Sequence, residues 1–232
     1  MNFKEEVLKF NISLDDSAEN KLNTYFSFLV EYNKHTNLTA ITEHDDVFIK
    51  HFLDSMLLNC AYDLSNKTLC DVGAGAGFPS VPNAIINKDV KVDIVDSLNK
   101  RIIFLNELIK RLGINNVNAY HARAEEWALT KRESYDVVSA RAVARLQILA
   151  ELCLPLVKIG GAFVAMKSLE SKDELSEAKK AIEVLGGKVK EIKHFELPYN
   201  MGSRDIIIIE KVKETPKKYP RAFAKIKQNP IN

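Results

Sequence analysis

From residue 66 onward, the chain alternates between short apolar runs and longer amphipathic stretches. Runs of about five apolar and β-branched residues predict strands, and apolar residues spaced three and four apart predict helices. The expected strand and helix pairs cover residues 68–72 and 81–86, 90–95 and 98–112, 117–121 and 125–129, 135–140 and 147–157, and 162–167 and 173–185. Strands that alternate with helices in this way predict a parallel sheet with helices packed on its faces.

The last two predicted strands, 188–195 and 205–212, break this alternation because only residues 196–204 lie between them. A crossover between parallel strands needs a dozen or more residues, so these two strands must form an antiparallel hairpin. Five parallel strands and a terminal hairpin make a seven-stranded, mostly parallel sheet in an α/β fold. This order resembles the Rossmann-like fold of class I S-adenosylmethionine-dependent methyltransferases and differs from the six-stranded sheet of the dinucleotide dehydrogenases.

The residues before the first strand are predicted to form helices over 16–33 and 44–59. In the first of these helices, the residues spaced to share one buried face are Leu22, Phe26, Leu29 and Val30. We therefore expect a helical N-terminal cap (1–65), an S-adenosylmethionine-binding methyltransferase domain (66–212) and a basic C-terminal tail (213–232), together one compact unit.

The tail is basic although the whole chain is nearly neutral. The sequence has 33 Lys and Arg against 31 Asp and Glu, a net charge of +2, so the molecule as a whole is not an obvious binder of polyanions. Between Lys211 and Lys227, however, seven basic residues stand against one acid, Glu214. Such a cluster indicates a local anionic partner, with a solvated and poorly ordered C-terminus as the alternative.

The sequence contains no segment that predicts membrane insertion or secretion. No run approaches the ~18 apolar residues of a membrane helix, and the first residues carry acids where a signal peptide carries bases. The cysteines Cys60, Cys70 and Cys153 include no C-x-x-C pair, which argues against a disulfide framework or a cysteine-rich zinc site. We expect a cytoplasmic protein without a metal, and a monomer because no predicted helix has a second apolar face.

Residues 71–79, Asp-Val-Gly-Ala-Gly-Ala-Gly-Phe-Pro, join the first predicted strand to its helix. Glycines at such a turn let a ligand approach the backbone closely. The dinucleotide pattern G-x-G-x-x-G fails because Phe78 stands where its third glycine is needed, and no Gly-Lys-Ser/Thr of a P-loop follows. The loop resembles the D/E-x-G-x-G-x-G signature of class I methyltransferases, although a purely structural turn is the alternative. The four matching residues are Asp71, Gly73, Gly75 and Gly77.

Further cofactor contacts are predicted at the carboxyl edge of the sheet, where open α/β folds bind ligands. Asp96 ends the second strand nineteen residues after the last glycine of the loop, close to the ~20-residue spacing of an acid that meets a ribose, and Asp93 in mid-strand is the competing acid. Ala124 and Glu125 follow the third strand, on the edge that meets adenine in this superfamily; Glu125 is alternatively a first-turn acid stabilised by the helix dipole. Arg141 follows the fourth strand among small residues, where packing explains it poorly.

The acceptor of the methyl group decides which side chains the reaction needs. A ring carbon of cytosine requires a cysteine nucleophile near the sheet edge, and none of the three cysteines is expected there. An exocyclic amine usually comes with an Asn/Asp-Pro-Pro-aromatic loop after the fourth strand, where this chain has residues 139–143 instead. Guanine N7 has a free lone pair and no proton to remove, so the absence of an obvious general base is consistent with N7.

Eight short segments stand out along almost the whole chain. They are Asn-Lys (33–34), Asn-Leu-Thr-Ala-Ile (37–41), His-Phe-Leu-Asp-Ser (51–55), the glycine loop (71–79), Asp-Ser-Leu-Asn-Lys-Arg (96–101), Ala-Arg-Ala-Val-Ala (140–144), Met-Lys (166–167) and Tyr-Pro-Arg (219–221). Together they resemble one bacterial family, the 16S rRNA guanine-N7 methyltransferases first named as glucose-inhibited division protein B.

This resemblance implies S-adenosylmethionine as the methyl donor and S-adenosylhomocysteine as the product. It implies a guanine in the 530 loop of 16S rRNA, at position 527 in the usual numbering, as the acceptor, presented by the RNA or by a small-subunit assembly particle. The cofactor contacts that it implies are Gly73, Phe78, Ala124, Glu125 and Arg141.

A rim of basic residues is predicted to contact RNA phosphates. Its members are Lys34, Arg145, Lys167, Arg204, Lys217, Lys218, Arg221, Lys225 and Lys227. Tyr219 is predicted either to stack on an unpaired base or to pack against the sheet. His51 and Asp54 lie three residues apart on one predicted helix, where a structural hydrogen bond is favoured over catalysis. Two other functions stay open: a small-molecule or protein methyltransferase, and a non-catalytic nucleotide-binding, ribosome-associated module.

Overall fold

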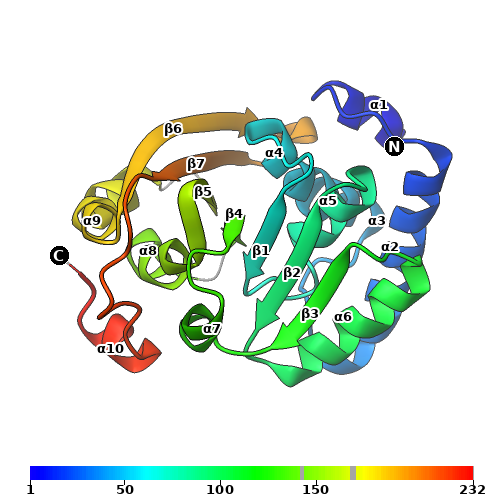
Figure 1. Ribbon diagram of the computed structural model, residues 1–232. Coiled ribbons are helices and arrows are strands. Elements are labelled where there is room, and N and C mark those ends of the chain that lie inside the picture. The colour runs from blue at the N-terminus through cyan, green and yellow to red at the C-terminus, as the bar shows by residue number, and fades with distance from the viewer. Residues whose placement is uncertain (142–143, 168–170, 232) are drawn as a thin grey trace.

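The computed structural model of the protein describes residues 1–141, 144–167 and 171–231, so Ala142 and Val143 of the predicted 140–144 segment lie outside the described residues. The N-terminal part is helical, as predicted (Figure 1). Its elements are α1 (Phe3–Leu8), α2 (Asp16–Thr36), α3 (His44–Val47), the π-helical turn η1 (Phe48–Leu53) and α4 (Asp54–Ala61).

The sheet has seven strands in the order β3-β2-β1-β4-β5-β7-β6 (Figure 1). They are β1 (Thr68–Val72), β2 (Lys91–Asp96), β3 (Val117–His121), β4 (Tyr135–Arg141), β5 (Val157–Lys167), β6 (Gly187–Glu196) and β7 (Ser203–Lys211). The first five pair in parallel, whereas β7 pairs antiparallel with both β5 and β6. The predicted hairpin and the predicted seven-stranded α/β fold are therefore confirmed.

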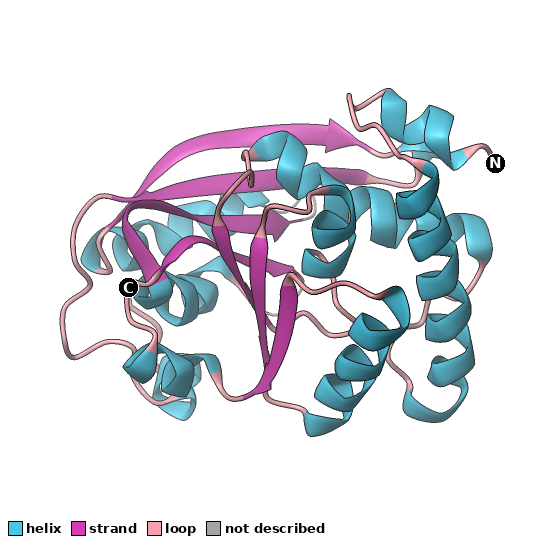
Figure 2. Ribbon diagram, turned by 45° about the vertical axis from the view of Figure 1, so that its right-hand side comes forward, coloured by secondary structure: helices cyan, strands magenta, loops and turns pink. Residues whose placement is uncertain are grey.

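Helices cover both faces of the sheet (Figure 2). The remaining helical elements are α5 (Ser80–Ile86), α6 (Asn99–Leu112), α7 (Ala124–Thr130), α8 (Leu146–Cys153), η2 (Leu154–Leu156), α9 (Ser171–Val184), η3 (Pro198–Asn200) and α10 (Phe223–Gln228). Side chains alternate between the faces along each strand, so Ile206 and Ile208 of β7 enter one hydrophobic core while Ile207 and Ile209 enter the other. The first core contains α2, α4, α5 and α6, and the second contains α7 to α10.

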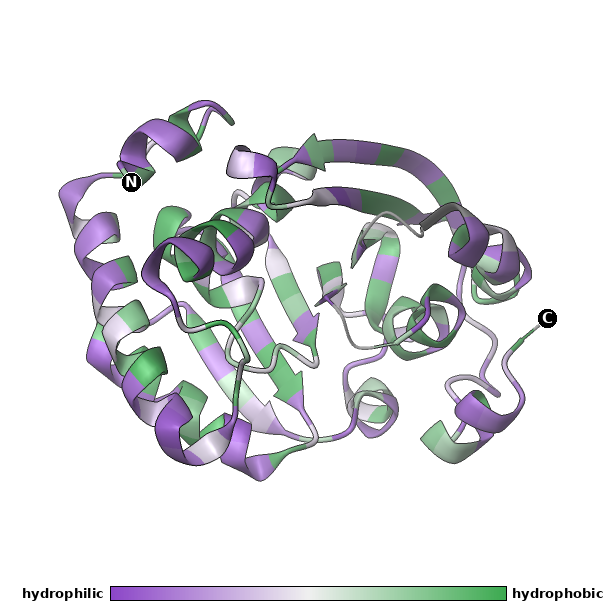
Figure 3. Ribbon diagram, turned by 180° about the vertical axis from the view of Figure 1, so that it is seen from behind, coloured by the Kyte–Doolittle hydropathy of each residue, from purple (hydrophilic) through white to green (hydrophobic). Residues whose placement is uncertain are grey.

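The buried face of helix α2 is predicted in part: Leu22 and Leu29 are fully buried, as expected, but the face is centred elsewhere. Tyr25 and Phe28 are buried, whereas Phe26 and Val30 are only half-buried. Both buried rings are fixed by aromatic partners from distant segments: Tyr25 stacks on Phe78 with centroids 5.4 Å apart, and Phe28 stacks on Phe104 at 5.1 Å. The alternating hydrophilic and hydrophobic colours along α2 in Figure 3 fit a helix packed on one side.

The helix predicted over 147–157 is shorter than expected. It ends at Cys153 and passes through a single 3-10 turn, because Pro155 has no N–H to continue the α-helical hydrogen bonds. Strand β5 then begins at Val157, opposite Tyr135, rather than at Ala162. In the part of the chain that the structure describes, no helix has both the length and the apolar character needed to cross a membrane.

Candidate cofactor site

Asp71, the acidic residue of the glycine-loop motif, links the two ends of the loop between β1 and α5. The Oδ2 atom of Asp71 accepts a hydrogen bond from the backbone N–H of Ser80 at 3.1 Å, so the end of β1 is tied to the first turn of α5. Asp71 is fully buried, and this burial raises the pKa of its carboxyl to about 7, while the hydrogen bonds from Ser80 and the charge of Arg141 oppose the shift. Asp71 therefore stabilises the conformation of the loop as a buried hydrogen-bond acceptor.

The raised pKa of Asp71 makes the stability of the fold depend on pH. Between the ordinary pKa near 3.8 and the folded value of about 7, the folded chain keeps a proton that the unfolded chain loses, so stability falls as pH rises through this window. We expect Asp71→Asn, which cannot ionise, to gain on the order of 4 kcal/mol relative to the wild type between pH 4 and 7. Urea unfolding at several pH values measures this difference, and parallel pH profiles for the two proteins would contradict it.

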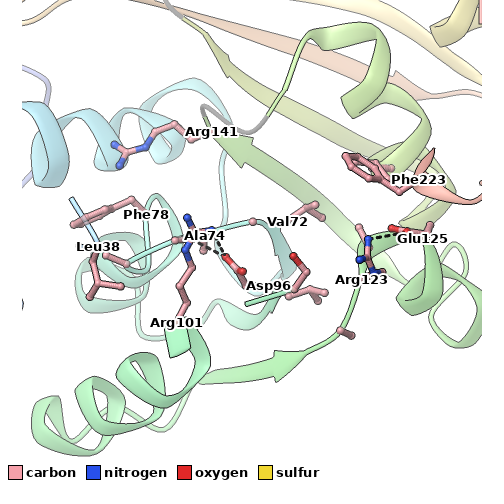
Figure 4. A pocket seen from close by; sticks show the side chains of 18 of the residues that line it. Leu38, Val72, Ala74, Phe78, Asp96, Arg101, Arg123, Glu125, Arg141 and Phe223 are labelled. Atoms are coloured by element: carbon pink, nitrogen blue, oxygen red, sulfur yellow. Dashed lines mark hydrogen bonds and ion pairs between the residues drawn. The ribbon is translucent and has the colours of Figure 1, made fainter. Parts of the chain in front are cut away.

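A cavity of about 380 Å³ opens above this loop, at the carboxyl ends of β1 to β4 (Figure 4). The residues that line it come from eight separate stretches of the chain. They are Leu38, Thr39, His51, Val72, Gly73, Ala74, Gly75, Ala76, Phe78, Val95, Asp96, Ser97, Arg101, Ala122, Arg123, Ala124, Glu125, Arg141, Leu152 and Phe223. The predicted positions Gly73, Gly75, Phe78, Asp96, Ala124, Glu125 and Arg141 are all among them.

Gly75 and Gly77 differ in role, although both have positive φ. A Cβ atom added to Gly75, at φ +61°, would meet no atom within 4 Å, so this glycine leaves space beside the cavity. A Cβ added to Gly77, at φ +101°, would come within 2.8 Å of Tyr25 Oη and of Val81 Cγ2. Gly77 therefore has a packing role, because its missing side chain admits the hydroxyl of Tyr25, which donates a hydrogen bond to the carbonyl of Ala76. A cofactor contact by Gly77 stays a prediction.

Asp96 stands at the middle of the cavity, at the end of β2. Its Oδ2 atom accepts hydrogen bonds from the backbone N–H of Gly75 at 3.3 Å and from Arg101 Nη1 at 3.0 Å, and its Oδ1 atom accepts from the N–H of Leu98 at 2.9 Å. These bonds fix the carboxylate against the glycine loop. The competing acid Asp93 points elsewhere and accepts a hydrogen bond from Tyr135 Oη at 2.8 Å.

One end of the cavity is mostly apolar. Ala122 and Ala124 contribute small side chains after β3, and Leu152 of α8 and Phe223 of α10 also line the cavity. Glu125 supplies a carboxylate there, close to Arg123 (Figure 4). A flat apolar group with a hydrogen-bond donor on its edge fits these surroundings. Nothing in the sequence pattern singled out Leu152 or Phe223, because both come from segments far along the chain.

Arg141 lies at the other end of the cavity, above the ring of Phe78, with 4.9 Å between its guanidinium carbon and the ring centroid. Its Nη1 atom donates to Asp54 Oδ2 at 3.0 Å. The other oxygen of Asp54 pairs with Nε of Arg204, also at 3.0 Å. Asp54 is 3% exposed, so one buried carboxylate holds two guanidinium groups and fixes the direction of Arg141.

The helical cap completes this end with side chains that the sequence did not mark as cofactor contacts. Thr39 Oγ1 lies 2.9 Å from His51 Nε2, and the imidazole stacks on Phe78 with centroids 4.5 Å apart. Burial and the nearby charge of Arg141 lower the pKa of His51 to about 4, so the ring is neutral at pH 7. The expected hydrogen bond between His51 and Asp54 is wrong: Asp54 is taken by the two arginines and His51 by Thr39.

The basic residues predicted to contact RNA fall into two groups. Four of them form ion pairs within the fold: Arg145 with Glu177, Lys167 with Glu174, Arg204 with Asp54, and Arg221 with Glu151. The other five are exposed, as the paired Arg145 also is: Lys34, Lys217, Lys218, Lys225 and Lys227. Tyr219 is half-buried and packs against the second core, as in the second of its two predicted roles. RNA contact by these residues stays a prediction.

Comparison with known proteins adds the family to this geometry. The profile described as "GidB: rRNA small subunit methyltransferase G" matches residues 18–206, which is most of the chain. The chain belongs to this family. A relative from Staphylococcus epidermidis, named "Ribosomal RNA small subunit methyltransferase G", is 51% identical over 98% of this chain and 96% of its own. A relative of the same name from Staphylococcus aureus is 53% identical over 94% and 92%.

Solved structures agree on the fold. A SAM-dependent methyltransferase from Aquifex aeolicus superposes with a TM-score of 0.54 at 16% identity, covering 75% of this chain and 97% of that one. TYW2 of M. jannaschii, solved in complex with AdoMet, gives 0.53 at 18% identity over 65% and 72%. Membership of the rRNA small subunit methyltransferase G family confirms the sequence-based assignment to the S-adenosylmethionine-dependent methyltransferases, with rRNA as the class of substrate.

Proposed function

We propose that the protein transfers the methyl group of S-adenosylmethionine to N7 of a guanine in the 530 loop of 16S rRNA. The choice of N7 as the acceptor atom rests on which titratable side chains line the cavity. Among its described lining residues, the carboxylates are Asp96, fixed against the glycine loop, and Glu125, at the far apolar end. His51 is the imidazole at the Arg141 end, and a pKa of about 4 makes it a poor base at pH 7. An acceptor atom with a free lone pair needs no base.

The described residues fit the donor along the whole cavity. Gly75 leaves open space, and the carboxylate of Asp96 retains lone pairs for sugar hydroxyls although it already accepts three hydrogen bonds. Gly73, Phe78, Ala124 and Glu125 all line the cavity, with Phe78 at the Arg141 end and Glu125 at the apolar end (Figure 4). These are the residues that we propose hold S-adenosylmethionine, which supplies an electrophilic methyl group when bound.

The side chains near Arg141 would act mainly by positioning. Arg141, clamped by Asp54, offers fixed N–H donors beside the cavity, and proximity and orientation of this kind supply as much as ~7–11 kcal/mol toward a transfer reaction. The neutral imidazole of His51 stacks on the ring of Phe78, and both side chains line the cavity. A planar base can stack on an aromatic side chain of this kind.

For the partner, we propose 16S rRNA, either free or within a small-subunit assembly particle, bound by a monomer in the cytoplasm. The exposed lysines Lys34, Lys217, Lys218, Lys225 and Lys227 are the contacts that we propose for its phosphates. Methylation of purified 16S rRNA and of assembly particles, measured side by side, distinguishes the two forms of the substrate.

The choice of N7 is tested with RNAs in which one ring atom or one exocyclic group of the guanine is changed. We expect a 530-loop RNA made with 7-deazaguanine to accept no methyl group, because a C–H replaces the nucleophilic nitrogen. An RNA with inosine in place of guanine lacks only the exocyclic amine and should still be methylated. Transfer of a tritiated methyl group measures both, and fluorescence anisotropy checks that both RNAs bind. Methylation of the 7-deaza RNA would refute N7 as the acceptor.

A further inference from the structure

The segment after β7, residues 213–231, is held against the body of the protein. Arg132 donates hydrogen bonds to three of its backbone carbonyls: Tyr219 O at 2.8 Å, Pro216 O at 3.2 Å, and Thr215 O. The carboxylate of Glu133 accepts from the backbone N–H of Thr215 at 2.8 Å. This segment therefore follows a defined path and is not the poorly ordered tail that the sequence left open.

A second anchor fixes the segment to α8. Arg221 donates from Nε and Nη2 to the two carboxylate oxygens of Glu151, at 2.8 and 2.6 Å, and its backbone N–H donates to the same carboxylate at 2.9 Å. Glu151 is 1% exposed, so this bidentate pair is largely screened from water. Ile226 of α10 is fully buried in the second core. The two contacts set the position of the residues between them.

Phe223 lies between these anchors and lines the cavity (Figure 4). Leu152, which directly follows Glu151 on α8, also lines the cavity, so one turn of helix both holds the segment and contributes to the cavity wall. Glu125 lies at the same end of the cavity as Phe223 (Figure 4). The cavity is thus lined at its apolar end by an aromatic ring that the C-terminal segment contributes.

We propose that Phe223 is a cofactor-binding residue that contacts the adenine ring of S-adenosylmethionine, and that Arg221 and Glu151 are positioning residues that hold it there. The inference rests on the proposed cofactor site. The chemistry is that of a purine between small apolar side chains and a phenyl ring, with a carboxylate, Glu125, within the same end to accept from an exocyclic amine. Stacking of an aromatic side chain on a nucleic acid base contributes ~1–3 kcal/mol.

The test measures binding to the full-length chain by titration calorimetry, with S-adenosylhomocysteine and with adenosine as probes. Phe223→Ala should raise the dissociation constants of both probes by about tenfold or more, because both probes carry the adenine ring. Phe223→Tyr should retain most of the affinity. Gln228→Ala, an exposed position on the same short helix, is the matched control and should leave both dissociation constants unchanged.

Arg221→Gln provides a second route that keeps the ring. This variant should weaken the binding of S-adenosylhomocysteine, because the Phe223 ring is no longer held in place. The double variant Arg221→Gln with Phe223→Ala should bind this probe no more weakly than Phe223→Ala alone. Additive losses would refute positioning through Phe223. Unchanged affinity for both probes in Phe223→Ala, or a loss restricted to S-adenosylhomocysteine, would overturn the proposed adenine contact.

These outcomes are separable from failure of the proposed function. A wild-type protein that bound neither probe would remove the cofactor site and this inference together. A wild-type protein that bound both probes but methylated a different RNA atom would overturn the choice of acceptor alone and leave the role of Phe223 intact.

Discussion

Replacing Arg141 by alanine is expected to lower kcat/KM for methyl transfer to RNA by at least about a hundredfold, the scale on which loss of one preorganised charged donor acts. The guanidinium lies over Phe78, lines the cavity and is fixed by the buried carboxylate of Asp54. The fold should survive, because Asp54 keeps its ion pair with Arg204. Steady-state kinetics measures the loss, and circular dichroism checks the fold.

The matched control for Arg141→Ala is Lys158→Ala. Lys158 also pairs with an aspartate, Asp136, at 2.9 Å, but this pair lies where β4 and β5 begin, at the opposite edge of the sheet from the cavity. Its loss should leave kcat/KM unchanged. Arg141→Lys keeps the charge but lacks the planar fork, so we expect it to recover only part of the activity. Wild-type kinetics in Arg141→Ala would remove this residue from the site.

The second large effect concerns two glycines that stand two residues apart. Gly77→Ala should destabilise the fold by about 2–5 kcal/mol, because positive φ costs a side chain ~1–2 kcal/mol and overpacking adds ~1–3. The new methyl group would collide with Tyr25 and Val81. Gly75→Ala bears only the backbone cost, because its Cβ meets open space, but this methyl would project beside the cavity and should weaken S-adenosylhomocysteine binding.

Each glycine variant is thus the control for the other. Urea unfolding should separate them by stability, and calorimetric titration with S-adenosylhomocysteine should separate them by affinity, with Gly75→Ala folded but weak in binding. If Gly77→Ala folded with wild-type stability, the packing role of Gly77 would be wrong. If Gly75→Ala bound the product as tightly as the wild type, the open space at this position would have no part in ligand binding.

The fold was accessible from the sequence because its signals are local. The spacing of apolar residues marks each strand, and the short connection 196–204 forces a hairpin wherever the sheet lies. What local spacing could not give is the choice among apolar residues on one helix. Tyr25 and Phe28 are buried in place of Phe26 and Val30 because Phe78 and Phe104, far along the chain, offer stacking partners.

The candidate site was predictable on the same terms. The glycine loop and the ends of β2, β3 and β4 follow from the order of elements, and Asp96, Glu125 and Arg141 do line the cavity. His51 and Phe223 were missed as cavity residues because their places depend on tertiary packing of the cap and of the C-terminal segment. The positive charge of Arg221 was the reason to predict an RNA contact there. In the structure Arg221 forms an ion pair with the buried Glu151, and a count of charges along the sequence cannot reveal such a pairing.

The cavity touches both hydrophobic cores. Leu38 and Phe78 belong to the layer of the first core, whereas Leu152 and Phe223 belong to that of the second. A molecule that fills the cavity therefore makes contacts that are lost when either layer opens. A bound ligand would therefore stabilise both sides of the sheet against local unfolding, by a free energy of RT ln(1 + [L]/Kd). The two layers, which are joined mainly through their shared strands, would then open as a single cooperative unit.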